Sequence, residues 1–400
     1  MKLSFNSMLY AFSRGLDYVE HDLLGVSTHH SKRVAYIAVS LGGQFGFTHK
    51  EKSDLAGCAL LHDNALTEYI QEEFELGRKV LDGEQGNFSR HCTIGEENIK
   101  SIPFFGDVSD VVLYHHERAD GDGPFGKKAP DIPPYAALIH MADELDAIFQ
   151  LNEVDREKYR QVLDFLKQNT GPNYFPEHAE AFLDIFDRRM LQRLRDEELE
   201  ASLNLALPKF RAEYSPEEVI SFAPFFAKII DYKSRFTKNH SMELAEKAAV
   251  IADYYRFDPE KKGIFFLAAA LHDIGKLAID TRILEKPDRL TKQEFSEVKN
   301  HAWHSYKILS EIDGFQAYNS WASFHHEKLD GSGYPFGYKA KDLGFEERLM
   351  ACLDIYQALV EKRPYKDGMK HAEAIEILDK MAKDGLIDQG IVGSLDERFA

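Results

Sequence analysis

Two short stretches of the chain contain residues that could bind metal ions. The stretch LHDIGKLAID holds the adjacent pair His272 and Asp273, with Lys276 one helical turn further on. The stretch FHHEKLDGSGYPFG holds His325 and His326, followed by a glycine-rich loop. Imidazole and carboxylate ligands without cysteine suit a hydrolytic metal site. If the first stretch is one continuous helix, Lys276 shares a face with the pair, and the sequence predicts a cation beside the metals.

The same pattern of residues occurs twice in the chain. The offset between the copies is 210 residues, as in 240 − 30 and 326 − 116, and it becomes 211 residues at 354 − 143, because Tyr334 has no counterpart. The matched pairs are His30 with His240, His62 with His272, Asp63 with Asp273, His91 with His301, His115 with His325, His116 with His326, and Asp143 with Asp354. An internal repeat of this kind indicates two copies of one folding unit.

The chain is predicted to be helical nearly throughout. Helix starts are marked by capping boxes at Thr48–Glu51, Ser215–Glu218 and Thr291–Glu294. No alternating run of useful length predicts a strand. We therefore expect an all-α protein with two tandem helical bundles, the first copy at 1–190 and the second at 215–400, with a connecting helix or linker at 191–214.

The second copy offers enough ligands for two metals if one carboxylate bridges them. The assignment is His240, His272 and Asp354 for one metal, His301, His325 and His326 for the other, and Asp273 between them. Two neighbouring divalent metals suit phosphate ester hydrolysis, because they lower the pKa of a water and bind a phosphate oxygen. Lys276 can stabilise the developing charge, and the fork of Arg363 is a second candidate phosphate contact.

Plainer interpretations exist for these residues. The repeat could preserve a polar core without metal, although buried imidazoles and carboxylates need partners. Lys276 could be a solvated helix lysine, Arg363 could form a surface salt bridge, and Tyr334 could simply close a turn. The repetition of six polar positions at one offset, with a seventh displaced by the single deleted residue, favours the metal hypothesis.

Composition limits the partners. The net charge of −18 argues against binding to nucleic-acid polymers, while a small anion held by metals stays compatible with it. Cys58, Cys92 and Cys352 are scattered and odd in number, and they are interpreted as reduced core thiols in a cytoplasmic protein. No apolar run of about 20 residues predicts a membrane span. A homodimer or a signalling protein partner stays open.

The motifs resemble those of the HD-GYP family of metal-dependent phosphohydrolases. The resemblance rests on HDIGK at 272–276, the isolated His301, HHEKLDGSGYP at 325–335, and Asp354 followed by RPY at 363–365. It implies an all-α bundle of the HD-domain type, with two or three metals that are most often iron or manganese; nickel, zinc or magnesium stay open. It also implies hydrolysis of bacterial cyclic dinucleotides.

Single residues follow from this resemblance. The seven assigned ligands match the family's ligands, Lys276 matches its substrate-contacting lysine, and the signature loop is Gly333, Tyr334 and Pro335. Phe236 stands where some members have a carboxylate for a third metal, which favours two metals here. Gln357 stands where the family has a second aspartate. The tandem arrangement is similar to that of bacterial phosphodiesterases for 3′,3′-cyclic GMP-AMP.

The first copy keeps the seven ligand positions but loses three other features. Leu66 replaces Lys276, Tyr334 is deleted, and no arginine of the RPY type follows Asp143. The first copy is therefore a candidate second metal site with a degenerate substrate site. A regulatory or scaffolding pseudo-domain is favoured over a phosphatase for the linear product or a competent twin.

The leading hypothesis is a cytoplasmic phosphodiesterase that converts 3′,3′-cyclic GMP-AMP, cyclic di-GMP or both to the linear dinucleotide. The alternatives are a general nucleotide phosphohydrolase of the HD class and a non-catalytic adaptor that binds cyclic dinucleotides. Arg363 and the extended glycine-rich loop favour the cyclic dinucleotide over the first alternative. The intact ligands of the second copy and Lys276 count against the second.

Overall fold

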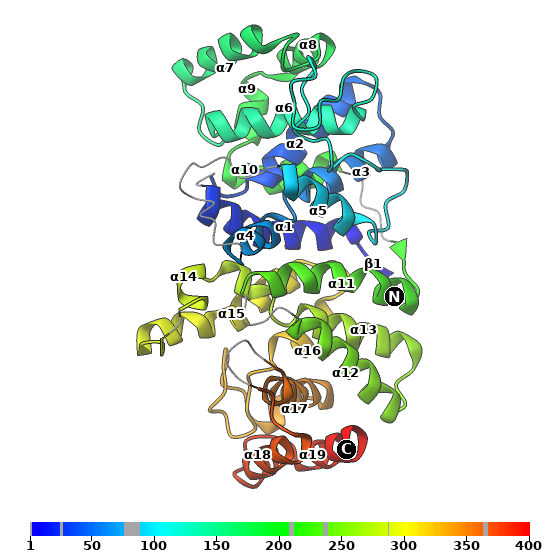
Figure 1. The fold of residues 1–400 in the computed structure, drawn as a ribbon, viewed down its shortest axis with the longest axis vertical. Coiled ribbons are helices and arrows are strands. Elements are labelled where there is room, and N and C mark those ends of the chain that lie inside the picture. Colours follow the sequence, from blue (N-terminus) through cyan, green and yellow to red (C-terminus); the bar gives the residue numbers. More distant parts are fainter. Residues whose placement is uncertain are drawn as a thin grey trace. The chain divides into compact units, whose positions relative to one another are not determined.

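In the computed structural model, helices form nearly all of the regular structure (Figure 1). The structure describes residues 2–24, 27–75, 89–207, 212–234, 239–286, 288–362 and 367–400. Within these ranges, strands are limited to one short antiparallel pair, β1 (Lys2–Leu3) and β2 (Ala212–Glu213). The all-α prediction is confirmed.

The chain divides into two compact units. The first unit is Leu16–Phe210, and the second unit combines Met1–Gly15 with Arg211–Ala400. Each unit holds one copy of the repeat. This division differs from the bounds proposed from the repeat, because the first fifteen residues join the second unit and the segment at 191–206 joins the first. The repeat-based bounds stay a prediction about sequence organisation.

The first unit is built around a buried arginine. The guanidinium of Arg33 is fully buried and donates from Nε to Asp146 Oδ1 (2.8 Å) and from Nη1 to Asp196 Oδ1 (3.0 Å). These contacts join helices α2, α6 and α10. The helices are the later part of α1 (Phe5–Leu24), α2 (His30–Gln44), α3 (His49–Leu60), α4 (Leu66–Glu75), α5 (Ser89–Ile99), α6 (Pro134–Phe149), α7 (Arg156–Asn169), α8 (Pro176–Ile185), α9 (Arg188–Arg193) and α10 (Asp196–Ala206).

The segment expected to form one connecting helix forms α9 and α10 instead. The helical structure is interrupted at Leu194 and Arg195. Asp196, the first residue of α10, accepts the hydrogen bond from Arg33. This pairing attaches the segment to the first unit. Residues 208–211 of the predicted linker lie outside the described residues.

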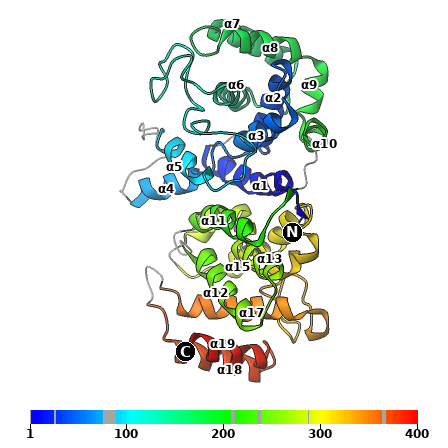
Figure 2. The same ribbon diagram turned by 90° about the vertical axis from the view of Figure 1, so that its right-hand side faces the viewer.

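The second unit has an apolar core between α1 and α11. Phe12 of α1 packs edge-on against Phe226 of α11, with ring centroids 4.8 Å apart. Figure 2 shows α17 beside α12, with α18 and α19 side by side next to α17. The elements are α11 (Pro216–Tyr232), α12 (His240–Tyr254), α13 (Pro259–Leu271), η3 (Ile274–Ala278), α14 (Thr281–Leu284), α15 (Lys292–Ser310), η4 (Gln316–Tyr318), α16 (Asn319–Ser323), η5 (Ala340–Asp342), α17 (Phe345–Val360), α18 (His371–Lys383) and α19 (Gln389–Phe399).

The helix starts predicted from capping boxes are confirmed. Thr48 caps α3, Ser215 caps α11 and Thr291 caps α15, and each pairs with a glutamate three residues on. In these boxes the hydroxyl and the carboxylate each accept a hydrogen bond from a free backbone N–H. Among the described residues, no helix is both long and apolar enough to cross a membrane.

Candidate metal centre

The His272–Asp273 pair lies where a helix ends, not inside one. Helix α13 ends at Leu271, and Lys276 lies in the short 3-10 helix η3. The expectation of one continuous helix through this motif is therefore wrong. Ser305 of α15 explains the break, because its hydroxyl donates to the His272 carbonyl (2.7 Å) and accepts from the Gly275 N–H (2.9 Å).

Glycine is required at position 275 by a close approach between η3 and α15. A Cβ atom at Gly275 would lie 2.0 Å from the carbonyl oxygen of His301, which no real contact allows. The glycine in HDIGK thus lets the two backbones touch. This contact is what carries His301 to the side of Asp273.

A buried glutamate shapes the glycine-rich loop. The carboxylate of Glu327 accepts hydrogen bonds from the backbone N–H groups of Phe336 (2.7 Å), Gly337 (3.2 Å) and Tyr338 (2.9 Å). The loop folds tightly around this carboxylate, and it places the ring of Tyr334 4.7 Å from that of His326. The signature loop therefore forms one side of the histidine cluster.

The structure brings all seven predicted ligands of the second copy together, with the five imidazoles arranged around the two carboxylates. The contacts to Asp273 are His272 Nε2 (3.1 Å), His301 Nε2 (3.3 Å) and His325 Nε2 (3.9 Å). The contacts to Asp354 are His240 Nε2 (3.2 Å), His272 Nε2 (3.8 Å) and His326 Nδ1 (3.9 Å). Asp273 lies between the two groups as expected, and Asp354 touches both groups as well.

Backbone carbonyls fix the orientation of three of these imidazoles. The pairs are His272 Nδ1 with Ala269 O (2.8 Å), His301 Nδ1 with Val298 O (2.6 Å) and His325 Nδ1 with Ala322 O (2.6 Å). A carbonyl only accepts hydrogen bonds, so each Nδ1 carries the hydrogen. In a neutral ring, Nε2 is then a bare lone pair, and all three Nε2 atoms face the carboxylates.

Burial keeps the imidazoles at one end of the cluster neutral. It lowers the pKa of His301 to about 3 and holds the pKa of His325 well below its usual value. The Nε2 atoms of these two neutral rings are 3.4 Å apart. Two lone pairs cannot bond to each other, but two nitrogens about 2.1 Å from one tetrahedral cation lie about 3.4 Å apart.

The carboxylates stay ionised. Burial alone would raise the pKa of Asp273, but the charges of His272 and Lys276 outweigh it and hold that pKa well below its ordinary range. Burial also opposes the ionised form of Asp354, but the hydrogen bond with His240 and the charges of the surrounding imidazoles together hold its pKa well below the ordinary range. The cluster thus combines ionised carboxylates with the neutral imidazoles of His301 and His325 at one end, and both kinds of group can bind divalent metals.

The donor atoms fit a metal by geometry as well. The ligand atoms of His301, His325 and His326 lie within 4.8 Å of one another, and so do those of His240, His272 and Asp273. The Oδ1 atom of Asp273 is buried and has no hydrogen-bond partner among the described residues. A buried carboxylate oxygen needs a cation or a donor, so these two groups are suited to hold metal ions.

The remaining predicted site residues fall into two groups. The Nζ atom of Lys276 donates to Asp273 Oδ2, so this lysine lies at the cluster. Gly333 closes the loop against Glu327, where a Cβ would lie 2.5 Å from the Cα atom. Pro335 follows Tyr334 in that loop. Arg363 and Phe236 lie outside the described residues.

The first copy gathers its seven residues in the same way. The contacts are His30 Nε2 to Asp143 (3.0 Å), His62 Nε2 to Asp143 (3.7 Å), His91 Nε2 to Asp63 (3.2 Å), His115 Nε2 to Asp63 (3.6 Å) and His116 Nδ1 to Asp143 (3.7 Å). The Nδ1 atoms of His62 and His115 also donate to backbone carbonyls. A donor set suited to metal is therefore present in both copies.

Sequence reasoning missed the residues that hold the ligands. Glu361 receives His240 Nδ1 (3.1 Å), and in the first copy Asp146 receives His30 Nδ1 (2.7 Å). Such partners fix the ring and raise its basicity as a metal ligand. The spacing offered a signal, because Glu361 comes seven residues, two helical turns, after Asp354 and thus on the same helical face.

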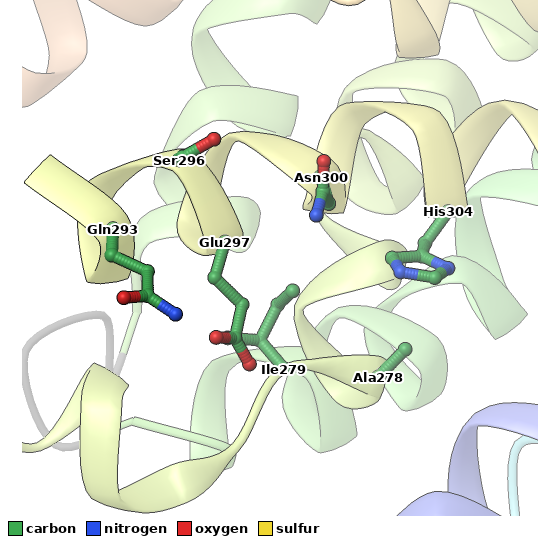
Figure 3. Close-up of a pocket in the computed structure, with 7 residues that line it drawn as sticks. All are labelled: Ala278, Ile279, Gln293, Ser296, Glu297, Asn300 and His304. Carbon is green, nitrogen blue, oxygen red and sulfur yellow. The ribbon is translucent and has the colours of Figure 1, made fainter.

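A polar hollow of about 420 Å³ lies between α15 and the segment that contains Ala278 and Ile279 (Figure 3). Its lining residues are Ala278, Ile279, Gln293, Ser296, Glu297, Asn300 and His304. None of the predicted ligands is among them. Burial lowers the pKa of His304, which the sequence analysis did not assign as a ligand. This hollow is therefore distinct from the metal centre.

Comparison with known proteins agrees with this geometry. Two HD-domain family models match the chain, one over residues 28–148 and the other over residues 224–391. The chain belongs to the HD-domain family and carries two HD domains in tandem, one in each copy. The histidine and aspartate clusters of both copies are consistent with HD-domain metal sites.

Its relatives extend over nearly the whole chain. It is 27% identical to the 3′3′-cGAMP-specific phosphodiesterase 1 of Vibrio cholerae, over 97% of this chain and 90% of that protein. It is also 27% identical to the 3′3′-cGAMP-specific phosphodiesterase 3 of Vibrio cholerae, over 80% of this chain and 69% of that protein. The resemblance to the HD-GYP family is confirmed, and the chain is related to cyclic dinucleotide phosphodiesterases.

A solved structure supports the fold. The crystal structure of a cyclic GMP-AMP specific phosphodiesterase from Vibrio cholerae matches with a TM-score of 0.68 at 20% identity, over 100% of this chain and 98% of that chain. At this identity the match supports the tandem helical fold alone.

Proposed function

We propose that the protein is a metal-dependent phosphodiesterase that converts a bacterial cyclic dinucleotide to its linear form. The preferred substrates are 3′,3′-cyclic GMP-AMP, cyclic di-GMP or both. The observation that carries the proposal is the second-copy cluster, in which Asp273 and Asp354 face five imidazoles with Lys276 at the edge. The names of the relatives supply the substrate class.

The second copy would hold two divalent ions, iron or manganese being the leading candidates. His240, His272 and Asp354 would hold one, His301, His325 and His326 the other, and Asp273 would lie between them. Bound ions supply Lewis acidity for a phosphate oxygen and lower the pKa of a water. The carboxylates would provide the negative charge that keeps both ions in place. The rings of His272, His301 and His325 are already oriented by the backbone, so they would not have to turn when the ions bind.

Lys276 would act on the substrate's phosphate. Its ammonium is partly exposed and contacts Asp273, so it can exchange that carboxylate for a phosphate oxygen without moving far. A cation at this position stabilises charge that develops on the phosphate and on the leaving oxygen. Tyr334 would close the site beside His326, and Lys299 lies over the Tyr334 ring, with Nζ 5.2 Å from its centroid. Arg363 stays a candidate phosphate contact.

The decisive experiment incubates the purified full-length protein with each of three nucleotides. Cyclic di-GMP, 3′,3′-cyclic GMP-AMP and cyclic di-AMP are assayed by anion-exchange chromatography, and p-nitrophenyl phosphate tests for general phosphohydrolase activity. We expect a linear dinucleotide from one or two of the cyclic substrates. The matched control, His272→Ala/Asp273→Ala, should give no product.

Two outcomes would contradict the proposal. Binding of a cyclic dinucleotide without turnover by metal-loaded protein would favour the adaptor. Rapid turnover of p-nitrophenyl phosphate with intact cyclic dinucleotides would favour a general phosphohydrolase.

A further inference from the structure

A thiol lies inside the histidine cluster of the first copy. Cys92 follows His91 in α5, its side chain is fully buried, and its Sγ atom lies 3.5 Å from His91 Nε2. The ligand atoms of His91, Cys92, His115 and His116 all lie within 4.8 Å of one another. In the part of the chain that the structure describes, this is the one such group that contains sulfur.

The sulfur–nitrogen distance is that of two ligands on one ion. In a tetrahedral site, a thiolate lies about 2.3 Å and an imidazole nitrogen about 2.0–2.1 Å from zinc, which separates the two ligands by about 3.5 Å. A second feature points the same way. His115 Nε2 and Asp63 Oδ1 are buried at this cluster and have no hydrogen-bond partner among the described residues.

The second copy has no thiol at the matching position. Cys92 corresponds to Ala302, since 302 − 210 = 92, and Ala302 is buried directly after His301 in α15. The corresponding group there consists of His301, His325 and His326 alone. Thiolate ligands favour softer ions such as zinc, whereas imidazole and carboxylate ligands also serve manganese and iron.

We propose that Cys92 is a metal ligand and that the first copy is a zinc-class site, chemically distinct from the centre of the second copy. His91, His115 and His116 would complete the set. Forming the sulfur–metal bond breaks the S–H bond and releases its proton to solvent, with no change of oxidation state. This inference rests on the proposal that the first copy binds metal.

The test is cobalt(II) substitution of the metal-free, full-length protein. A thiolate bound to cobalt gives a charge-transfer absorption in the near ultraviolet that imidazole and carboxylate ligands do not give. Wild-type protein should show this band, and Cys92→Ala should lose it. Alanine is the residue that the second copy holds at this position, so the variant should keep the fold. Cys58→Ala and Cys352→Ala, which remove the other two buried thiols, should keep the band.

Bound cobalt is counted in the same samples, with His272→Ala/Asp273→Ala used to isolate the first copy. Competition with zinc should show at least about a tenfold weaker first site in Cys92→Ala, since even indirect changes at metal sites cost 10–100-fold. The proposal is overturned if the band persists in Cys92→Ala, or if cobalt fills the first copy without any band. If the first copy binds no cobalt, this proposal and the first-copy metal site both fail, while hydrolysis by the second copy still stands.

Discussion

The two copies keep the same ligand positions but surround them with different charges. In the first copy, Arg33 pairs with Asp146, which also receives His30 Nδ1. The matching residues in the second copy are Glu243 and Gln357, and here Gln357 Nε2 donates to Glu243 Oε2 (2.8 Å). The buried arginine–aspartate ion pair of the first copy is replaced in the second copy by a hydrogen bond from an amide to a carboxylate.

The first histidine ligand of each copy keeps an acceptor at its Nδ1 atom despite this exchange, because another carboxylate takes the place of the aspartate. Glu361 receives His240 Nδ1 in the second copy, four residues after Gln357 on the same helical face. Loss of the family's second aspartate at position 357 is thus compensated one turn further on. A metal-binding imidazole needs an acceptor at its other nitrogen, and the fold supplies one in either way.

The close approach between η3 and α15 at Gly275 and Ser305 shows a second exchange of residues between the copies. Gly275 and Ser305 correspond to Ala65 and Gly95, so the smaller residue moves from one side of the contact to the other. Gly95 is tightly packed, since a Cβ there would lie 3.1 Å from Asn64 Nδ2. Both copies therefore keep the close approach that brings the third histidine to the aspartate.

The differences that are not compensated concern the substrate. Leu66 replaces Lys276, and the loop of the first copy lacks Tyr334. The comparison teaches that the ligand set and the substrate contacts vary independently. We therefore expect both copies to bind metal and only the second to catalyse hydrolysis.

The largest expected effect is a difference in hydrolysis between variants of Asp273 and of its first-copy counterpart Asp63. Asp273→Asn should abolish hydrolysis, because the amide removes the charge that faces His301, His325 and Lys276. The matched variant Asp63→Asn should lose metal from the first copy and keep hydrolysis. Product chromatography and metal analysis of both variants give the answer. Equal loss of activity in the two folded variants would break the proposed division between the copies.

The next effect tests the phosphate contact. Lys276→Leu reproduces the first copy at Leu66, and it should lower kcat about a hundredfold while metal content stays unchanged, because one contact to developing charge is worth about 3 kcal/mol. Steady-state rates and metal analysis measure this. Wild-type activity in the variant would show that Lys276 makes no contact with the phosphate that matters for hydrolysis.

A smaller effect tests the compensating carboxylate. Glu361→Gln should weaken metal binding or activity about tenfold, since partners of ligating imidazoles typically contribute 10–100-fold. Asp146→Asn is the counterpart in the first copy, and it should weaken metal binding there without slowing hydrolysis. Metal titrations of both variants decide the matter. An unchanged metal affinity in Glu361→Gln would remove this role from Glu361.

The smallest signal is the proton released on metal binding. Burial opposes the charged form of His240, but hydrogen bonds to Asp354 and Glu361 outweigh it and raise its pKa to about 10. Burial opposes protonation of His30 as well, and Asp143 and Asp146 hold its pKa well above the usual value. Both rings therefore hold a proton more tightly than a free imidazole does, so metal binding must displace that proton and acid must weaken metal binding.

Calorimetry at pH 7 in two buffers of different ionisation enthalpy measures this release. We expect about one proton from each of these two rings, together with the thiol proton of Cys92 in the first copy. His62→Ala/Asp63→Ala should remove the first copy's share. Metal binding without proton release would contradict the assignment of His240 as a ligand.

The sequence alone determined the repeat, the helical class, the helix starts and the candidate ligands. These depend on residue type and local spacing: a capping box acts within one turn, and a duplicated set of histidines keeps its offset whatever the fold. The three cysteines are buried and form no disulfide, as their scatter and odd number predicted.

Tertiary structure decided what the spacing could not show. Glu361 meets His240 across 121 residues of sequence, and Ser305 ends a helix that lies 33 residues earlier in the chain. Cys92 gained meaning only because the fold placed its sulfur beside three imidazoles. Contacts of this kind depend on which helix faces are packed together, and periodicity within one helix does not reveal the residues on its neighbour.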